Sequence, residues 1–346
     1  MKKYIDRIAG GEELNAADVG EIVETLVDEE ACPDGKAGFL EALAKKGETP
    51  GEIACFVAQL LERAVNPGIE HLFSEEPTID VCGTGGDKLN LFNVSTTSMF
   101  IIAAGGAVVL KHGNRGITSK SGGADVLEAL GIRIDLPPEG FRDCLAKAGL
   151  GFLFAPMYHP AFKAIMPVRK ILAEKGVRTI FNLIGPLLNP ARPACQLVGV
   201  FSPELPPVYA EILQRMGRKS AWAVHGETRD GHPVDELSTM GRTTICSTRG
   251  GAYTKEVIEP ADYGMNEVAA ADLKGGDAEQ NAHILTEILG GRDRGPRRDI
   301  ALLNAGAGLA CCGLSQDLQS GIQQARELVE SGAAMEKLRL LQLAAR

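Results

Sequence analysis

The sequence lacks any apolar run long enough to cross a bilayer. Its longest such run, 99–110, spans twelve residues and includes two glycines, whereas a membrane-spanning helix needs about 20 apolar residues. The first residues, 1–7, carry charge, and no apolar segment of the kind found in secretory signals follows them. We therefore expect a cytoplasmic protein with no membrane partner.

Paired-cysteine motifs are also missing. The eight cysteines are scattered without Cys-x-x-Cys spacing, and most of them lie in apolar runs, as Cys55 and Cys195 do. This pattern predicts reduced core residues and is typical of neither a zinc site nor a disulfide framework.

An excess of positive charge is absent as well. Asp and Glu number 45 against 36 Lys and Arg, which gives a formal net charge of −9. This balance argues against a broad nucleic-acid-binding face but leaves room for a local basic pocket. The apolar content of 45% is ordinary for a globular protein, and 346 residues suffice for two domains.

The chain divides into a helical part and an α/β part. Helical spacing of apolar residues, with cap signals at Asn15 and Thr49, predicts a small all-helical domain over 1–72, joined by a helical segment near 163–185. Residues 73–346 alternate short apolar runs with helix-like segments, which predicts an α/β domain with a mainly parallel central sheet and ligand loops at the carboxyl ends of its strands. The alternation around 243–258 predicts a β-hairpin.

The most informative segment is a glycine-rich loop, 83–93, which follows the strand-like run at 78–81. Gly83, Gly85 and Gly86 let the backbone turn tightly, and Asn93, Ser95 and Thr96 stand where an apolar helix begins. Free N–H groups at a helix start favour an anion such as phosphate. The loop is neither of the common nucleotide loops, since position 88 is not glycine and no Gly-Lys-Ser/Thr follows. Glycine-rich turns also occur for packing alone.

A second loop, 111–123, follows the next predicted strand. Lys111 and Arg115 supply positive charge, Thr118 and Ser119 supply donors, and a helix is predicted directly afterwards. Two such loops on neighbouring parallel strands would meet at one cleft, which fits a ligand that bears a pyrophosphate. The alternative interpretation is a solvated basic loop.

An acidic pair, Asp235 and Glu236, completes the set. Adjacent carboxylates can hold Mg²⁺, a hard ion that takes oxygen ligands and usually bridges to phosphate. Acidic pairs are also common on protein surfaces, so this pair alone does not indicate a metal site.

Together the motifs Gly-Thr-Gly-Gly-Asp at 83–87, Asn-x-Ser-Thr at 93–96 and Lys-His-Gly-Asn-Arg at 111–115 resemble the anthranilate phosphoribosyltransferase family over nearly the whole chain. The resemblance implies transfer of the phosphoribosyl group of 5-phosphoribosyl 1-pyrophosphate (PRPP) to the amine of anthranilate in tryptophan biosynthesis. It also implies Mg²⁺, two ions with one on PRPP, and a homodimer.

The resemblance implies binding roles for specific residues. The implied PRPP contacts are Gly83, Gly86, Asp87, Asn93, Ser95, Thr96, Lys111, Gly113, Asn114, Arg115, Thr118 and Ser119. The implied anthranilate contacts are Gly83, His112, Asn114 and Arg169, and the implied metal ligands are Ser95, Asp235 and Glu236. No residue is assigned as a catalytic acid or base, because a weakly basic aromatic amine can attack a cation-like ribose without one.

The sequence departs from the family pattern in three places. Leu91 stands where a hydroxyl side chain is usual, Gly116 and Gly123 replace common serines, and the connection 226–235 is longer than usual. Two alternatives therefore stay open: a different aromatic amine or nucleobase as acceptor, and a non-catalytic paralogue that binds a phosphorylated ligand.

Overall fold

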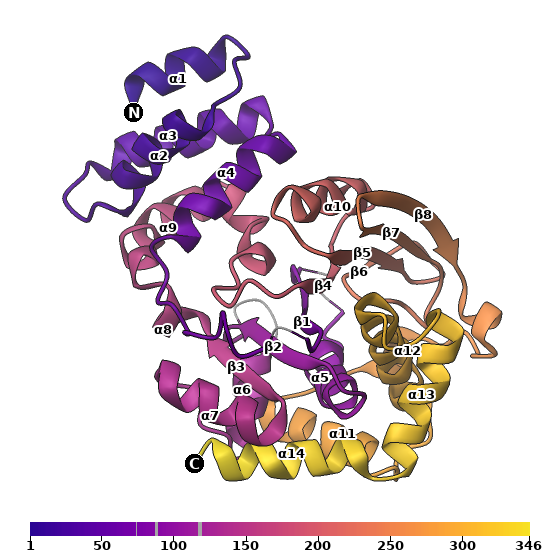
Figure 1. Cartoon of the computed structure of the whole chain (residues 1–346). Coiled ribbons are helices and arrows are strands. Elements are labelled where there is room, and N and C mark those ends of the chain that lie inside the picture. Colours follow the sequence, from indigo (N-terminus) through magenta and orange to yellow (C-terminus); the bar gives the residue numbers. More distant parts are fainter. Residues whose placement is uncertain (74, 87–88, 117–119) are drawn as a thin grey trace.

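The computed structural model describes residues 1–73, 75–86, 89–116 and 120–346. It confirms the predicted fold class: a small helical bundle, α1–α4, precedes a larger α/β domain (Figure 1). The bundle helices are α1 (Lys2–Ala9), α2 (Ala16–Val27), α3 (Pro33–Lys46) and α4 (Pro50–Leu61). The remaining α-helices are α5 (Val94–Ala104), α6 (Gly123–Ala129), α7 (Pro138–Ala148), α8 (Ala155–Tyr158), α9 (Met166–Glu174), α10 (Leu205–Arg215), α11 (Ala278–Leu289), α12 (Pro296–Cys312), α13 (Leu318–Glu330) and α14 (Ala333–Ala344).

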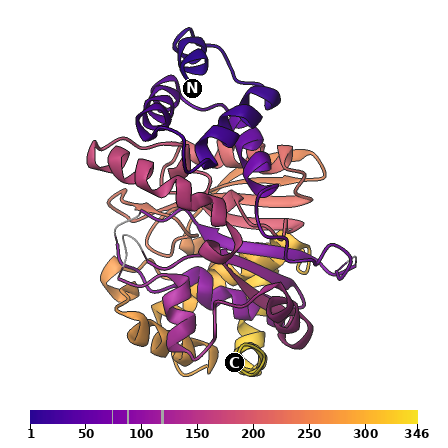
Figure 2. The same ribbon diagram turned by 90° about the vertical axis from the view of Figure 1, so that its left-hand side faces the viewer.

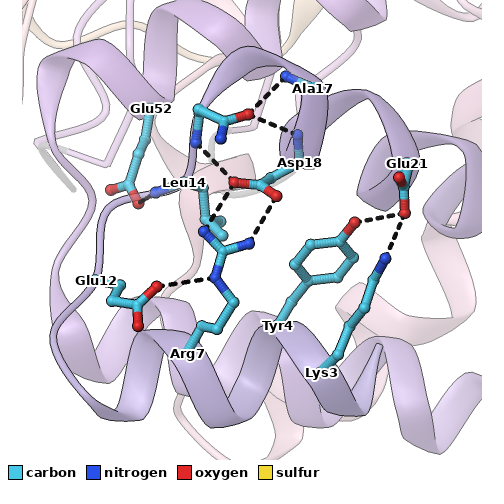
Figure 3. A network of polar contacts seen from close by, with 10 residues as sticks. Lys3, Tyr4, Arg7, Glu12, Leu14, Ala17, Asp18, Glu21 and Glu52 are labelled. Atoms are coloured by element: carbon cyan, nitrogen blue, oxygen red, sulfur yellow. Dashed lines mark hydrogen bonds and ion pairs between the residues drawn. The ribbon is translucent and has the colours of Figure 1, made fainter.

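Local capping starts two of the bundle helices as predicted. The Asn15 side chain accepts hydrogen bonds from Ala17 N and Asp18 N, and Thr49 with Glu52 forms a capping box. Figure 3 shows how α1 is fixed to α2: the Arg7 guanidinium binds the Asp18 carboxylate at 2.7 and 3.0 Å. These contacts stabilise α1, whose N-terminus has no side-chain cap.

The central sheet is mainly parallel, as predicted. Its strands are β1 (Thr78–Gly83), β2 (Val108–Gly113), β3 (Leu150–Phe154), β4 (Cys195–Gly199), β5 (Ser220–Glu227), β6 (Pro233–Val234), β7 (Thr243–Arg249) and β8 (Ala252–Ile258). The order is β3-β2-β1-β4-β5-β7-β8, with β6 paired to β5. Strands β1 to β5 run parallel, whereas β7 and β8 form the predicted antiparallel hairpin.

The two faces of the sheet are covered by different helices. One core includes Ile79 and Val81 of β1, and α5, α12 and α14 cover it. The other includes Val198 of β4 and Ala221 of β5, and it is continuous with the core of the helical bundle. Figure 2 shows the bundle at one end of the molecule, the sheet in the middle and the C-terminal helices at the other end.

The α/β chain returns to the bundle at α9 and α10. Helix α9 packs on α3, and α10 packs on α4. The predicted boundary at residue 72 and the predicted joining segment near 163–185 stay predictions. Within the described residues, no helix is long and apolar enough to span a membrane.

Candidate active site

The first loop turns directly at the carboxyl end of β1. Thr84 N donates to Gly199 O at 2.9 Å, which extends the pairing of β1 with β4. Gly85 and Gly86 have φ values of +73° and +100°, which L side chains rarely adopt, so glycine is required there. Gly85 N donates to Asp235 Oδ2 at 2.6 Å. The first loop and the acidic pair, 150 residues apart in sequence, therefore meet.

Three glycines make room for the acidic segment, which we define as 235–238. A Cβ at Gly199 would lie 1.6 Å from Asp235 O, and one at Gly83 would lie 2.3 Å from Asp235 Oδ2. A Cβ at Gly226 would lie 2.5 Å from Glu236 O. The segment thus crosses the ends of β1, β4 and β5 in direct contact with their backbones. Gly199 and Gly226 were not among the predicted site residues, because only the folded sheet shows what lies above them.

A buried asparagine of α12 fixes the same segment from the other side. Asn304 Oδ1 accepts from Leu237 N at 3.0 Å, and its Nδ2 donates to Leu237 O at 2.9 Å. The side chain is 1% exposed, so these bonds replace water that cannot reach the segment. The sequence contains a signal that was missed: a single amide inside the apolar run 300–310 requires a buried partner.

The start of α5 brings the predicted metal ligands together. Ser95 N donates to Glu236 Oε1 at 3.1 Å, and Lys111 Nζ donates to Ser95 Oγ at 3.3 Å and to Val81 O at 2.6 Å. Asp235 is held against Gly85 as described above. A hydroxyl and two carboxylates at one sheet edge are oxygen donors suited to Mg²⁺, which commonly takes one or two carboxylates and completes its shell with water and phosphate. Among the described residues, no group of three or more His, Cys, Asp or Glu side chains is placed to hold a metal ion. A metal at this sheet edge would therefore need water or ligand oxygens as well.

Asn93 links the first loop to the second. Its Nδ2 donates to Ser121 O at 3.3 Å, and its Oδ1 accepts from Asn281 Nδ2 at 2.8 Å. Asn281, on α11, is 3% exposed and also accepts from Gly276 N at 2.8 Å. Asn281 therefore sets which way the Asn93 amide points. It was not predicted, since this contact spans 188 residues of sequence.

The second loop is organised by Asp125 in the first turn of α6. Its Oδ2 accepts from Gly116 N at 2.9 Å and from Gly122 N at 2.7 Å. Arg115 contacts the Asp125 and Glu128 carboxylates and lies over the Phe154 ring, 5.5 Å from its centroid. The Arg115 charge is thus directed at α6 in this structure. The predicted residues Thr118 and Ser119, like Asp87 of the first loop, lie outside the described residues.

Lys111 and His112 leave β2 on opposite faces. Lys111 reaches Ser95 on the α5 side, whereas the ring of His112 packs edge-on against that of His159, with centroids 5.2 Å apart. Burial lowers the pKa of His112 to about 3, so its imidazole is neutral at physiological pH. The His112 backbone N–H donates at 3.3 Å to Asp80, a fully buried carboxylate that also accepts from Asn189 at 2.9 Å. Asp80 and Asn189 therefore fix the carboxyl end of β2 by hydrogen bonds to its backbone at His112 N and Leu110 O.

Arg169 comes from a different element than the two loops. It is on α9, which packs against α3 of the helical bundle. Burial lowers the pKa of its guanidinium, which makes no hydrogen bond or ion pair with the described residues. Gly113 and Asn114 belong to the second loop, and Asn114 O accepts from Ala124 N at 3.4 Å.

The departures from the family pattern have local explanations. Leu91 forms an isolated bridge with Lys274 and packs beside Phe92, so it serves the core. A Cβ at Gly123 would lie 2.9 Å from Thr96 Oγ1, so a serine there would displace a predicted PRPP contact. Glu227 pairs with Pro233 across the 226–235 connection. This pairing folds the connection back onto β5. The acidic segment that follows it lies in contact with Gly83 and Gly199 despite the extra residues.

Comparison with known proteins agrees with this geometry. Residues 75–335 match the glycosyl transferase family a/b domain, and residues 2–64 match the helical bundle domain of the same family. These matches define a two-domain glycosyl transferase.

Individual relatives narrow the class. The chain is 44% identical over 341 residues to the anthranilate phosphoribosyltransferase of Anaeromyxobacter dehalogenans, covering 99% of this chain and 97% of that one. The crystal structure of the anthranilate phosphoribosyltransferase from Thermus thermophilus superposes with a TM-score of 0.89 at 38% identity, over 99% of both chains. The enzyme from Saccharomyces cerevisiae, solved with PRPP and Mg, superposes with a TM-score of 0.84 at 26% identity, over 99% of this chain and 97% of that one. The chain belongs to the anthranilate phosphoribosyltransferase family.

Proposed function

We propose that this protein transfers the phosphoribosyl group of PRPP to the amine of anthranilate, giving N-(5-phosphoribosyl)anthranilate and pyrophosphate in tryptophan biosynthesis. One observation carries the proposal: Gly85 N binds Asp235 and Ser95 N binds Glu236 at the same edge of the sheet. This joins a phosphate-type loop, a helix start and a pair of carboxylates. Membership of the family supports the choice of substrates.

Magnesium would be held by Ser95, Asp235 and Glu236, with PRPP oxygens completing the shell. The Saccharomyces cerevisiae relative was solved with PRPP and Mg, which supports use of this ion. When bound, Mg²⁺ neutralises charge on the pyrophosphate group. Two ions, one travelling with PRPP, remain part of the proposal.

PRPP would lie over the two loops. The proposed contacts among the described residues are Gly83, Gly86, Asn93, Ser95, Thr96, Lys111, Gly113, Asn114 and Arg115. Departure of pyrophosphate leaves positive charge on the ribose and negative charge on the leaving group. The Lys111 ammonium is held by Val81 O and Ser95 Oγ before the reaction, so it would stabilise that negative charge without reorganising.

The acceptor would approach from the side of His112 and Asn114. A neutral His112 adds no positive charge beside the cation-like ribose, and its buried Nε2 has no partner among the described residues. Arg169, whose guanidinium is unpaired there, would bind the anthranilate carboxylate together with Gly83 and Asn114. Because Arg169 is on the bundle side, binding would bring the two domains toward each other.

Mass spectrometry of the product tests the proposal directly. Incubation of purified protein with PRPP, Mg²⁺ and anthranilate should give N-(5-phosphoribosyl)anthranilate, and Glu236→Gln should require more Mg²⁺ for the same rate. A parallel reaction with other aromatic amines and nucleobases is the comparison. Faster turnover of any of those acceptors would overturn the assignment of anthranilate.

Two further features belong to the proposal. The eight cysteines are all free thiols, which supports a reducing, cytoplasmic location. A homodimer is proposed from the family, and light scattering coupled to gel filtration should give twice the mass of 36.7 kDa.

A further inference from the structure

A pocket of about 610 Å³ lies at the far end of the α/β domain from the helical bundle. It is formed where α11 and α13 end and where α12 and α14 begin, among the C-terminal helices in the lower part of Figure 1. The active-site residues described above lie at the carboxyl ends of the strands instead. The pocket therefore belongs to a different part of the domain.

Three arginines line this pocket from three separate segments. Arg294 comes from the loop before α12, Arg298 from the first turn of α12 and Arg326 from α13. The one acidic residue in the lining is Glu330. The lining thus carries three positive charges and one negative charge, an excess that favours an anion.

The guanidinium groups are poorly satisfied by the protein itself. The Nε atoms of Arg298 and Arg326 are buried and have no hydrogen-bond partner among the described residues. Arg298 is 13% exposed, and its nearest carboxylate, Asp299, is 3.7 Å away, beyond hydrogen-bond distance. Arg294 and Arg326 form no ion pair with any residue that the structure describes. Among the described residues, the three guanidinium groups of the lining have one ion pair, the 3.7 Å contact of Arg298 with Asp299, so their positive charge favours an anion from outside.

Helix capping does not account for these arginines. The last carbonyls of α11 already accept from loop N–H groups, as Glu287 O does from Arg292 N at 3.0 Å. The last carbonyls of α13 do the same, since Val329 O accepts from Gly332 N at 3.1 Å.

We propose that this pocket is a second anion site that binds the phosphoryl group of a small phosphorylated metabolite. Guanidinium groups from three segments suit a tetrahedral dianion better than a planar carboxylate. The volume exceeds what inorganic phosphate needs and falls in the range of about 300–1,000 Å³ typical of small-molecule sites. This second site is proposed independently of the reaction described under the proposed function.

Calorimetric titration with inorganic phosphate tests this site. The wild-type protein should show a class of phosphate sites that Arg326→Gln weakens at least about tenfold. Arg298→Gln provides a second variant with the same expectation. The matched control is Arg292→Gln, which removes the same charge from the loop between α11 and α12, but from a guanidinium already held by Glu287 at 2.8 Å. That control should leave phosphate binding unchanged.

Further measurements separate the possible outcomes. Succinate, a dicarboxylate probe, should bind this class of sites more weakly than phosphate does. Phosphate binding that is equal in wild type and Arg326→Gln would overturn the proposal, as would equal loss in Arg292→Gln. Anthranilate turnover by each variant shows that it is folded. If the protein shows no turnover at all, circular dichroism replaces that check, and the phosphate result still decides the pocket alone.

Discussion

Replacing Gly199 with alanine tests whether the acidic segment must touch the sheet edge. The new Cβ would lie 1.6 Å from Asp235 O, 2.2 Å from Asp235 C and 3.0 Å from Glu236 N. Non-bonded carbon contacts are comfortable at about 3.5–4.0 Å. The segment would therefore have to retreat by roughly 1.5–2 Å, which would pull Asp235 away from Gly85 N and Glu236 away from Ser95 N.

A displacement of that size is large for a catalytic group. A misplacement of about 1 Å can cost about 10²-fold in rate. We therefore expect kcat/KM for PRPP in Gly199→Ala to fall by about 10²-fold or more, with a higher Mg²⁺ requirement. Steady-state rates measured across a range of Mg²⁺ concentrations would show both effects.

The control keeps the chemistry of the change and removes the clash. Gly35→Ala adds the same methyl group to α3, where nothing lies within 4 Å, and should leave kinetics unchanged. Thermal unfolding shows whether Gly199→Ala is folded. If it does not fold, Gly83→Ala, whose Cβ would meet the movable Asp235 side chain first, offers a milder test. A folded Gly199→Ala enzyme with wild-type kcat/KM at limiting Mg²⁺ would refute the reasoning.

Three further predictions follow from other contacts. Arg169→Ala should raise KM for anthranilate by about 10- to 100-fold while KM for PRPP changes little, because a charge-assisted pair contributes about 1.5–3 kcal/mol. Lys170→Ala, on the exposed side of the same helix, is the control, and equal effects on both substrates would contradict the role of Arg169. Asn281→Ala should raise KM for PRPP several-fold, because the Asn93 amide loses its 2.8 Å partner; an unchanged KM would show that this contact does not position Asn93. Burial lowers the pKa of His159 to about 4, so the unfolded chain takes up a proton below pH 6.5 before the native state does. Urea unfolding should show about 2 kcal/mol of stability lost from this group between about pH 7.5 and 5, and His159→Gln should remove that part of the loss. The same pH dependence in both proteins would exclude His159 as its source.

The sequence was sufficient wherever local chemistry determines structure. The caps at Asn15 and Thr49 depend on side chains within three residues of each helix start, so they are visible without the fold. The hairpin at 243–258 is equally local. The strands of the parallel sheet were found because each contains a short apolar run, and β1 to β4 each precede a helix.

The supporting residues of the site were not predictable in the same way. Gly199, Asn281 and Asn304 act on segments that are distant in sequence, and only the assembled sheet brings them into contact. Nothing in the residues around position 115 indicated that its charge would face Glu128. The neutral state of His112 likewise comes from burial beside His159, which no local pattern indicates.

The most direct test of the central claim follows the fluorescence of anthranilate after purified protein is mixed with PRPP and Mg²⁺. The account predicts a loss of signal that requires all three components and that stops when the metal is chelated. An unchanged signal, in a sample where calorimetry still detects PRPP binding, would contradict anthranilate as the acceptor.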